Sequence, residues 1–188
     1  MRHKYETRGI VLTRSPLGET SALITLLTPE LGLVRARAQG LRSPGAKLAP
    51  ALATFRESEL TLVRGKEGWR ISGALLDEDW FSRLERAALH RRAARVTGLL
   101  LRLVGEGQEP ALYGTMRGFF ETLATESDEL HEAAEMLAVL HMLATLGLDA
   151  GALPDVDDQY SSEVLASVTR DRATYIARIN HDLAASGL

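Results

Sequence analysis

The side chains that could carry metal chemistry in this sequence lack the spacing that such chemistry requires. The segment HEAAE, His131 to Glu135, begins as a zinc-protease helix does. Such a helix needs histidines at positions i and i+4, with the intervening Glu as general base. Glu135 occupies the second ligand position, so we expect the solvated first turn of an ordinary helix.

Two acidic clusters are the other candidates for a metal site. They are DED, Asp77 to Asp79, and DVDD, Asp155 to Asp158. Neither has the sixth-position Gly and twelfth-position Glu of a calcium-binding loop. We interpret them as charge at a helix N-terminus and as a solvated loop, and we expect no bound metal and no cofactor.

The sequence also offers no arrangement for nucleophilic or nucleotide chemistry. It has no Cys, no G-x-S-x-G turn, no phosphate-binding G-x-x-x-x-G-K-[ST] loop and no G-x-G-x-x-G turn. His90, His131, His141 and His181 fall in predicted helices without a neighbouring nucleophile, and His141 is expected to pack in a core. We therefore expect a protein that is not an enzyme.

Charge is divided unevenly along the chain. Residues 1–76 contain 12 Lys or Arg against 6 Asp or Glu, whereas residues 77–188 contain 10 against 19. Such asymmetry predicts that only the first part meets a polyanion. The candidate phosphate-binding cations are Arg14, Arg35, Arg37, Arg42, Lys47, Arg64, Lys66 and Arg70, with Arg8 nearby.

The loop after Arg37 is suited to phosphate contact, because Gly40 and Gly45 let backbone N–H groups approach a ligand closely. Aromatic platforms for bases are few: Tyr5, Phe55 and Trp69. Trp69 follows a turn, and the sequence leaves open whether it lies at a barrel rim or anchors the core. Sparse aromatic residues favour sequence-tolerant binding through the backbone. Neutralising about four single-strand phosphates predicts a salt slope near −3.

The elements that position these residues change character near residue 80. Five short strands are expected at 6–14, 21–28, 33–38, 55–65 and 69–76, with turns at Ser15–Glu19 and Gly65–Gly68 and a short helix or turn over 45–55. Five closely spaced strands favour a small closed barrel. In the third strand, Arg35 and Arg37 share one face, opposite Val34 and Ala36.

The second part has helical periodicity. Helices are expected from about Phe81 to Gly105, over 111–125, from an N-cap at Ser127 to Gly147, over 162–167 and over 172–185. The N-terminal segment has no apolar signal-peptide core, and no apolar run reaches about 18 residues, so we expect a cytoplasmic protein that contacts no membrane.

Four segments of the basic part form a pattern within residues 1–76: the GIVL strand, LGETSALITLLTPELG, the ARAQGLRSPGAKL loop and the LTLVRG strand with its hairpin. With these segments, the basic part resembles the N-terminal domain of the RecO family of bacterial recombination mediators. The segment LHMLATLGLD is similar to a helix end in the family's C-terminal domain. The resemblance implies an α+β protein of two domains: an OB-fold barrel over residues 1–79 and a helical domain over 80–188.

The resemblance also implies a function and partners. A RecO-like protein binds single- and double-stranded DNA, promotes strand annealing and helps load RecA onto DNA coated by single-strand-binding protein (SSB). Its partners would be RecR and the C-terminal tail of SSB. Arg35, Arg37, Arg42 and Lys47 would then contact phosphates. The four-cysteine zinc module of many members is missing, because LDAGALPDVDDQYSS contains no Cys.

Three other interpretations remain open at this point. The basic face could grip an acidic protein partner, as in an interaction adaptor, or it could bind RNA, because the sequence does not show whether a 2′-hydroxyl is recognised. A metal-dependent hydrolase is a more distant alternative. In the helical part, Arg91, Arg92, Arg95 and Arg102 could flank a groove for an acidic partner tail, or they could simply solvate one helix face.

Overall fold

The computed structural model describes residues 3–154 and 160–187, so the DVDD cluster lies outside the described residues. The chain forms two compact units. One contains the chain up to Glu85 together with Val104–Tyr113, and the other contains Arg86–Leu103 together with the chain from Gly114 onward. These units differ from the boundary expected after residue 79, because residues 80–85 and 104–113 cluster with the strands.

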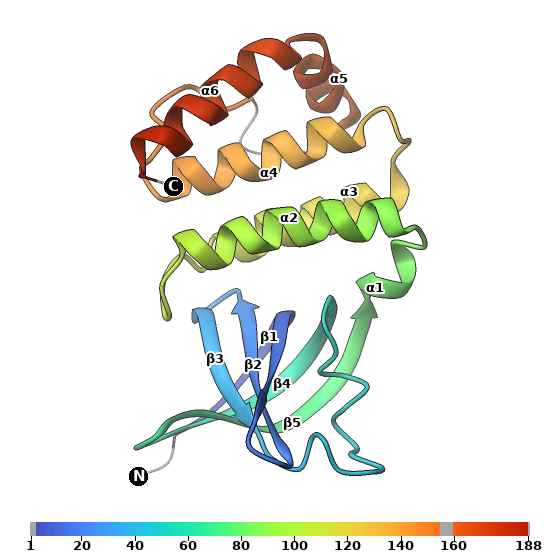
Figure 1. Cartoon of the computed structure of the whole chain (residues 1–188), viewed down its shortest axis with the longest axis vertical. Helices are drawn as coiled ribbons and strands as arrows, with labels where there is room; N and C mark the ends of the chain where they lie inside the picture. The colour runs from blue at the N-terminus through green and yellow to red at the C-terminus, as the bar shows by residue number, and fades with distance from the viewer. Residues whose placement is uncertain (1–2, 155–159, 188) are drawn as a thin grey trace. The chain divides into compact units, whose positions relative to one another are not determined.

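The first unit is a five-stranded sheet that closes on itself in the order β1-β2-β3-β5-β4 (Figure 1). The strands are β1 (His3–Leu17), β2 (Ser21–Thr28), β3 (Gly32–Ala38), β4 (Arg56–Gly65) and β5 (Gly68–Asp79). The expectation of five strands followed by helices is confirmed. β1 and β5 are longer than expected, because β1 pairs with β4 through its first half and with β2 through its second half, and β5 pairs with β4 from end to end.

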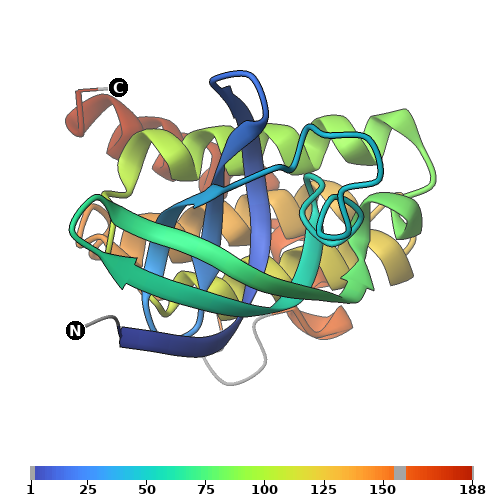
Figure 2. The ribbon, with the colours of Figure 1, turned by 90° about the horizontal axis from the view of Figure 1, so that it is seen from below.

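A short parallel contact completes the ring. Four of the five pairings are antiparallel, whereas β3 runs parallel to β5 and pairs with it only at Ala36 with Trp69 and at Arg37 with Arg70. Viewed from below, the long hairpin of β4 and β5 sweeps across the ends of the other strands (Figure 2). This contact brings β3 beside the β4–β5 hairpin, whose paired residues lie 33 positions further along the chain.

The barrel interior is filled by one side of each strand. In β3, Val34, Ala36 and Ala38 are buried, whereas Arg35 and Arg37 are exposed, as their alternation predicted. Leu60 and Leu62 of β4 face the same interior. Alternation therefore directs the apolar residues inward and leaves the arginines on the outer surface.

Two connections between strands can be compared with the turns that the sequence predicts. Gly65 pairs with Gly68, which confirms the two-residue hairpin between β4 and β5. The long segment between β3 and β4 consists of turns and bends, so the choice between helix and turn over 45–55 is settled in favour of turns. Phe55, with φ of 61°, ends this connection as a buried residue.

Residues 104–113 return to the barrel through backbone contacts at the start of β3. Gly107 donates its N–H to the carbonyl of Leu33 at 2.7 Å, and Leu33 donates its own to the carbonyl of Gln108 at 3.2 Å. Gly32 has φ of 63°, and a Cβ there would lie 2.1 Å from the Gln108 carbonyl oxygen. Only glycine permits both this backbone conformation and this close approach.

A buried carboxylate ties further residues to the barrel. Glu57 of β4 is 1% exposed, and its Oε2 accepts a hydrogen bond from the Trp80 indole at 3.0 Å. The Tyr113 hydroxyl donates to Oε1 of the same carboxylate. These contacts explain why Trp80 and Tyr113 cluster with the strands rather than with the helices.

The helices are interrupted where a single first helix was expected. They are α1 (Trp80–Arg83), α2 (Ala87–Leu103), α3 (Leu112–Thr125), α4 (His131–Thr145), α5 (Ser162–Arg170) and α6 (Arg172–Ala185). Glu85, with φ of 37°, separates α1 from α2, so the prediction of one helix from Phe81 was wrong. Asp79 caps α1 by accepting a hydrogen bond from the Ser82 N–H, which confirms its predicted place at a helix N-terminus.

The start of α4 differs from the expected solvated turn. The helix begins at His131, and Ser127 is not its N-cap. His131 is 2% exposed, with Nε2 lying 2.8 Å from the Glu126 carbonyl oxygen. Eleven of the 15 residues of α4 are buried, so the HEAAE segment enters the core of the unit instead of facing solvent.

Within the helical unit, α4 lies between α2 on one side and α5 and α6 on the other (Figure 1). The buried residues of α2, Leu89, Ala93, Val96 and Leu100, recur every three or four positions and form one apolar face. Across the described ranges 3–154 and 160–187, no helix has the length and apolar content needed to cross a bilayer.

Tyr160 packs directly on the backbone of α3. Its hydroxyl donates to the Thr115 carbonyl oxygen at 3.1 Å, and its ring lies over Gly118, where an added Cβ would be 2.7 Å from Cδ2. Burial raises the pKa of this phenol far above its ordinary value.

Gly118→Ala should therefore destabilise the protein by about 1–3 kcal/mol through overpacking against Tyr160. Gly98→Ala in α2 is the matched control, because nothing lies within 4 Å of its added Cβ. That change should stabilise by up to about 1 kcal/mol through helix propensity. Urea unfolding measures both, and equal stabilisation by the two substitutions would contradict the packing of Tyr160 on α3.

A buried ion pair holds α6 to the segment after α4. Arg178 donates Nε to Asp149 Oδ1 at 3.0 Å and Nη2 to Oδ2 at 2.5 Å, and the Asp149 side chain is 3% exposed. Burial raises the pKa of Asp149, but hydrogen bonds from Arg178 and from the Gly151 N–H outweigh it and hold the pKa below its usual value.

Because the folded-state pKa is lowered, this stabilisation is complete above about pH 4 and is lost as the pH falls through the folded-state value. Asp149→Asn should lower the free energy of unfolding by about 1–3 kcal/mol at pH 7. The difference from the parent chain should shrink toward pH 2. Glu129→Gln, at an exposed position, is the control. A deficit for Asp149→Asn that is independent of pH would rule out the ion pair as its source.

Candidate nucleic-acid interface

A groove of about 1050 Å³ runs over the outer surface where β3 meets the β4–β5 hairpin. Five of the eight cations proposed from the sequence line it: Arg35, Arg37, Arg64, Lys66 and Arg70. The groove also includes Trp69, His3, Gln39 and apolar side chains of β1 and β2. The barrel therefore gathers cations from two regions of the sequence, residues 35–37 and 64–70, on one surface.

Local structure explains this convergence. Arg35 and Arg37 point outward because the alternate residues of β3 fill the core. In the hairpin, the Gly65–Gly68 pair places Arg64 opposite Trp69 and Val63 opposite Arg70. Lys66 lies at the tip of the turn. A two-residue turn thus presents cations and an indole together.

Two arginines lie side by side across the parallel contact. Arg37 pairs with Arg70, and both line the groove. Like charges directly opposite each other in a sheet are destabilising. An anion bound between them would remove this repulsion, so the arrangement is suited to a phosphate group.

Trp69 and Tyr5 form an aromatic pair beside these cations. Their ring centroids are 5.1 Å apart with an interplanar angle of 74°, an edge-to-face arrangement. The Arg64 guanidinium carbon lies 4.9 Å from the centroid of the Trp69 ring. The sequence left open whether Trp69 lies at a rim or anchors the core, and the structure shows both: its side chain packs against the barrel core and also lines the groove, partly exposed. Phe55 is 6% exposed and offers no platform for a base.

Carboxylates at the groove limit its positive charge. Glu106 and Glu67 both line it. Glu106 lies 3.9 Å from Arg64, and the two side chains are 42% and 50% exposed. Sequence patterns could not reveal Glu106, because it reaches the groove only through the return of residues 104–113. Arg64 and Trp69, in contrast, could have been paired from the two-residue hairpin alone.

The other three proposed cations do not line this groove. Arg42 donates Nη1 to the Gly18 carbonyl oxygen at 2.8 Å, and Arg14 lies 3.5 Å from the Leu41 carbonyl oxygen. Lys47 is exposed on the β3–β4 connection. Gly40 and Gly45 in that connection have φ of 67° and 72°, and space is open around both. The expected phosphate-binding loop is thus separate from the residues that form the groove.

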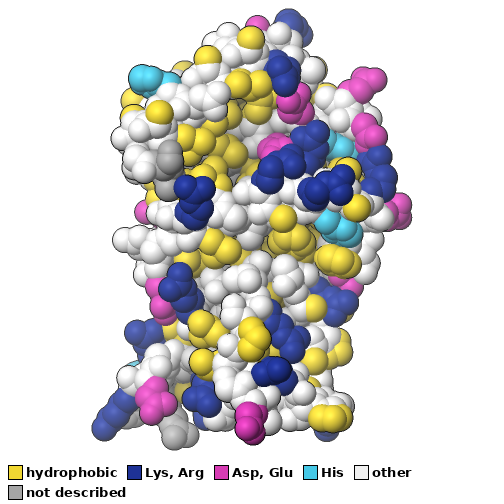
Figure 3. Space-filling model, in the orientation of Figure 1, with side chains coloured by type: hydrophobic (Ala, Val, Ile, Leu, Met, Phe, Trp, Pro, Cys, Tyr) yellow, Lys and Arg dark blue, Asp and Glu magenta, His cyan; other side chains and the backbone are white. Residues whose placement is uncertain are grey.

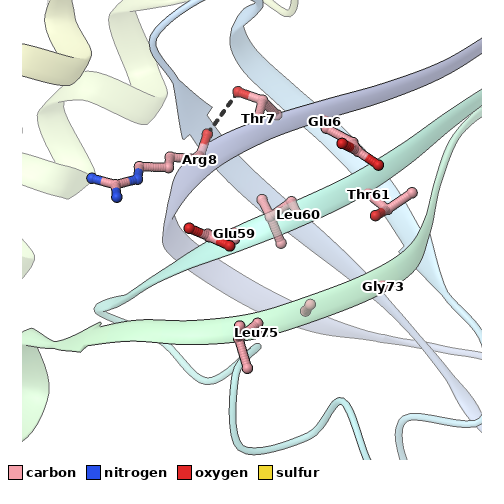
Figure 4. Close-up of a pocket in the computed structure, with 9 residues that line it drawn as sticks. Glu6, Thr7, Arg8, Glu59, Leu60, Thr61, Gly73 and Leu75 are labelled. Carbon is pink, nitrogen blue, oxygen red and sulfur yellow. Dashed lines mark hydrogen bonds between the residues drawn. The ribbon is translucent and has the colours of Figure 1, made fainter.

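A second depression, of about 530 Å³, lies on β1, β4 and β5 (Figure 4). The carboxylates of Glu6 and Glu59 line it, and Arg8, its single cation among the described lining residues, lies 3.5 Å from Asp77. These charges are unfavourable for phosphate. Over the visible face of the barrel, Lys and Arg side chains are interspersed with acidic ones (Figure 3), so the grouping of five cations distinguishes the groove.

The arginines proposed for the helical part have different surroundings. Glu135 accepts from Arg92 Nη1 at 2.6 Å and from Arg95 Nε and Nη2 at 2.7 Å each. The hydrogen bonds that Arg95 donates to Glu135 raise the pKa of Arg95. Arg91 and Arg102 are exposed on α2. Arg92 and Arg95 therefore bind a carboxylate of this chain, which neither the partner-groove nor the solvated-face interpretation predicted.

The acidic side chains and histidines are the remaining candidates from the sequence. Among residues 3–154 and 160–187, no group of three or more His, Asp or Glu side chains is placed to hold a metal ion. His141 is buried, as expected for core packing, and its ring lies 6.5 Å from that of Tyr160. Burial lowers the pKa of His141, which favours the neutral imidazole.

The described residues combine a closed five-stranded barrel with five cations and Trp69 in one outer groove, an arrangement suited to a polyanion. Comparison with known proteins narrows the class of protein. Residues 1–76 match the family described as Recombination protein O N terminal. The chain as a whole is 33% identical to the DNA repair protein RecO of a Synechococcus strain, in an alignment of 172 residues that covers 83% of this chain.

Two further relatives bear the same name. The DNA repair protein RecO of Gloeobacter violaceus is 32% identical over 154 residues, 81% of this chain. That of Acaryochloris marina is 43% identical over 74 residues, which cover 39% of this chain and 25% of the relative. The chain belongs to the RecO family. It spans 57% of the length of both the Synechococcus and the Gloeobacter proteins.

The repulsion between Arg37 and Arg70 predicts a measurable effect on stability. Arg37→Ala should raise the free energy of unfolding by about 0.2–1 kcal/mol at low salt. The gain should disappear near 1 M salt, where charges are screened within about 3 Å. Arg35→Ala is the control, since Arg35 lies on the same face opposite Thr25. If urea unfolding shows the same change for both variants, the like-charge pair is not the cause.

Proposed function

We propose that this chain is a non-enzymatic DNA-binding protein of recombinational repair, and that its barrel is an OB-fold whose groove binds a DNA strand. The observation that carries the proposal is the meeting of Arg35, Arg37, Arg64, Lys66 and Arg70 with Trp69 in one groove. The names of the relatives support a role in DNA repair.

The position of the groove supports this assignment. OB-folds bind oligonucleotides on the face of strands 2 and 3, between the loop that joins strands 1 and 2 and the loop that joins strands 4 and 5. Here the lining residues come from β2 and β3, from the end of β1 at Leu17 and from the β4–β5 turn. The chain therefore has its cations at the surface that this fold uses for nucleic acid.

The remaining proposed cations extend the contact. We propose Arg42, Lys47 and Arg14 as additional phosphate contacts outside the groove, where a longer strand or a duplex would reach them. Neutralising phosphates lowers the repulsion between two DNA strands, which supports the proposal that the protein promotes annealing of complementary strands. Binding of both single- and double-stranded DNA follows from the same backbone contacts.

Family membership extends the proposal to partners. In this view the protein helps load RecA onto DNA coated by SSB, together with RecR. An SSB tail would present carboxylates to the helical unit. Arg91 and Arg102 are the candidates for that contact, because both are exposed and the guanidinium groups of Arg92 and Arg95 already bind Glu135. An acidic protein and an RNA strand are the two alternative ligands of the groove. The competition experiment below distinguishes both of them from DNA.

The test measures fluorescence anisotropy of a labelled oligo(dT) strand as salt is raised. The double variant Arg35→Ala with Arg37→Ala should weaken binding, and the salt slope should fall from about −3 to about −1.5, because each single-strand phosphate contributes about 0.7. Arg91→Ala with Arg102→Ala removes the same charge from the helical unit and should leave both affinity and slope unchanged.

Competition with a matched RNA strand, a duplex and a poly-glutamate peptide identifies the preferred polyanion. Absence of oligo(dT) binding at low salt would overturn the proposed function. Displacement of the DNA strand by the peptide at equal concentration of charge would favour the adaptor, and displacement by a lower concentration of RNA than of DNA would favour RNA.

A further inference from the structure

We infer that Trp69 is a stacking position for one unpaired nucleobase, and that the Arg64 guanidinium occupies this position until a strand binds. The inference rests on the proposed function and specifies its substrate as an unpaired strand. It comes from a feature that charge alone does not explain: an indole, in edge-to-face contact with Tyr5, lies among the cations of the groove.

The geometry around Trp69 resembles that of a stacked planar ligand. Tyr5 supports the indole edge to face at 5.1 Å, so the ring is held in one orientation. Arg64 lies over the indole at 4.9 Å. A guanidinium is planar and stacks on aromatic faces, as a nucleobase does. Arg64 therefore marks a space on the indole that a flat group can fill.

Arg64 is also free to leave that space. Its side chain is 50% exposed, and its contact with Glu106 is long, at 3.9 Å. An exposed ion pair of this kind contributes little to stability. A phosphate is a stronger partner for a guanidinium than a screened carboxylate at this distance. When a base takes the indole face, Arg64 can move from Glu106 to the adjoining phosphate.

The cations around Trp69 lie where the phosphates of a stacked nucleotide would be. Arg70 is the next residue after Trp69, and Arg37 pairs with it across the parallel contact. A base on Trp69 would therefore have its sugar–phosphate backbone beside two guanidinium groups. Bases in a duplex are stacked on each other and are not available to the indole. The aromatic position thus favours a single strand, whereas the cations alone accept either form.

The experiment separates base contacts from phosphate contacts. Binding of oligo(dT) is compared with binding of an abasic oligonucleotide that has the same number of phosphates. Trp69→Ala should weaken oligo(dT) binding about tenfold or more and should leave abasic binding within about twofold. Leu75→Ala is the matched control, because Leu75 is 67% exposed and lies outside the groove. It should change neither affinity.

Intrinsic fluorescence gives a measurement that needs no variant. Trp80 is fully buried and Trp69 is partly exposed, so a change on strand binding reports on Trp69. Oligo(dT) should quench the emission, whereas the abasic strand should bind without quenching. Both results together support the stacking position.

The failures are distinguishable. If Trp69→Ala weakens both strands equally, or if both strands quench equally, the stacking position is overturned while the proposed function stands. If neither strand binds the parent chain at low salt, the proposed function itself fails.

Discussion

The short parallel contact between β3 and β5 is the constraint on which this protein depends. It closes the barrel through only two residue pairs, Ala36 with Trp69 and Arg37 with Arg70. Ala36 is buried in the barrel core beside strands that contribute larger apolar residues. Its small side chain faces inward while Arg37 faces outward. The same strand contact therefore closes the core and forms the groove.

The groove retains charges that weaken the fold locally. Arg37 and Arg70 are paired across the parallel contact, and neighbouring guanidinium groups repel each other. Elsewhere in the described chain, arginines are commonly neutralised by the protein itself: Arg178 binds Asp149, and Arg95 binds Glu135. Arg37 and Arg70, in contrast, are paired with each other. Natural proteins often accept lower stability at sites that must bind a ligand.

Much of the barrel could be predicted because its signals are local. The alternation in β3 predicted which face carries Arg35 and Arg37, and the Gly65–Gly68 turn predicted the hairpin. The residues that share the groove could be suspected from their charge. Their division into five groove residues and three others depends on which strands become neighbours, and sequence spacing does not contain that information.

The errors have physical causes of the same kind. His131 follows a good capping residue, yet burial against other helices places it inside the core and shifts the start of α4. Helix propensity over 81–86 is strong, but the Trp80 indole donates a hydrogen bond to the buried carboxylate of Glu57. The helix then ends at Arg83, and Glu85 adopts a φ of 37°. The pairing of Arg92 and Arg95 with Glu135 spans two helices and has no local signature.

Site mapping of a photocrosslinked strand tests the central idea most directly. A single strand containing 5-iodouracil is irradiated with the full chain, and the attached peptides are sequenced. The groove on β3 and the β4–β5 hairpin predicts attachment at Trp69 or Tyr5. Attachment at the depression lined by Glu6 and Glu59, or on the helices from α2 to α6, would show that a nucleic-acid strand binds elsewhere and would contradict the account.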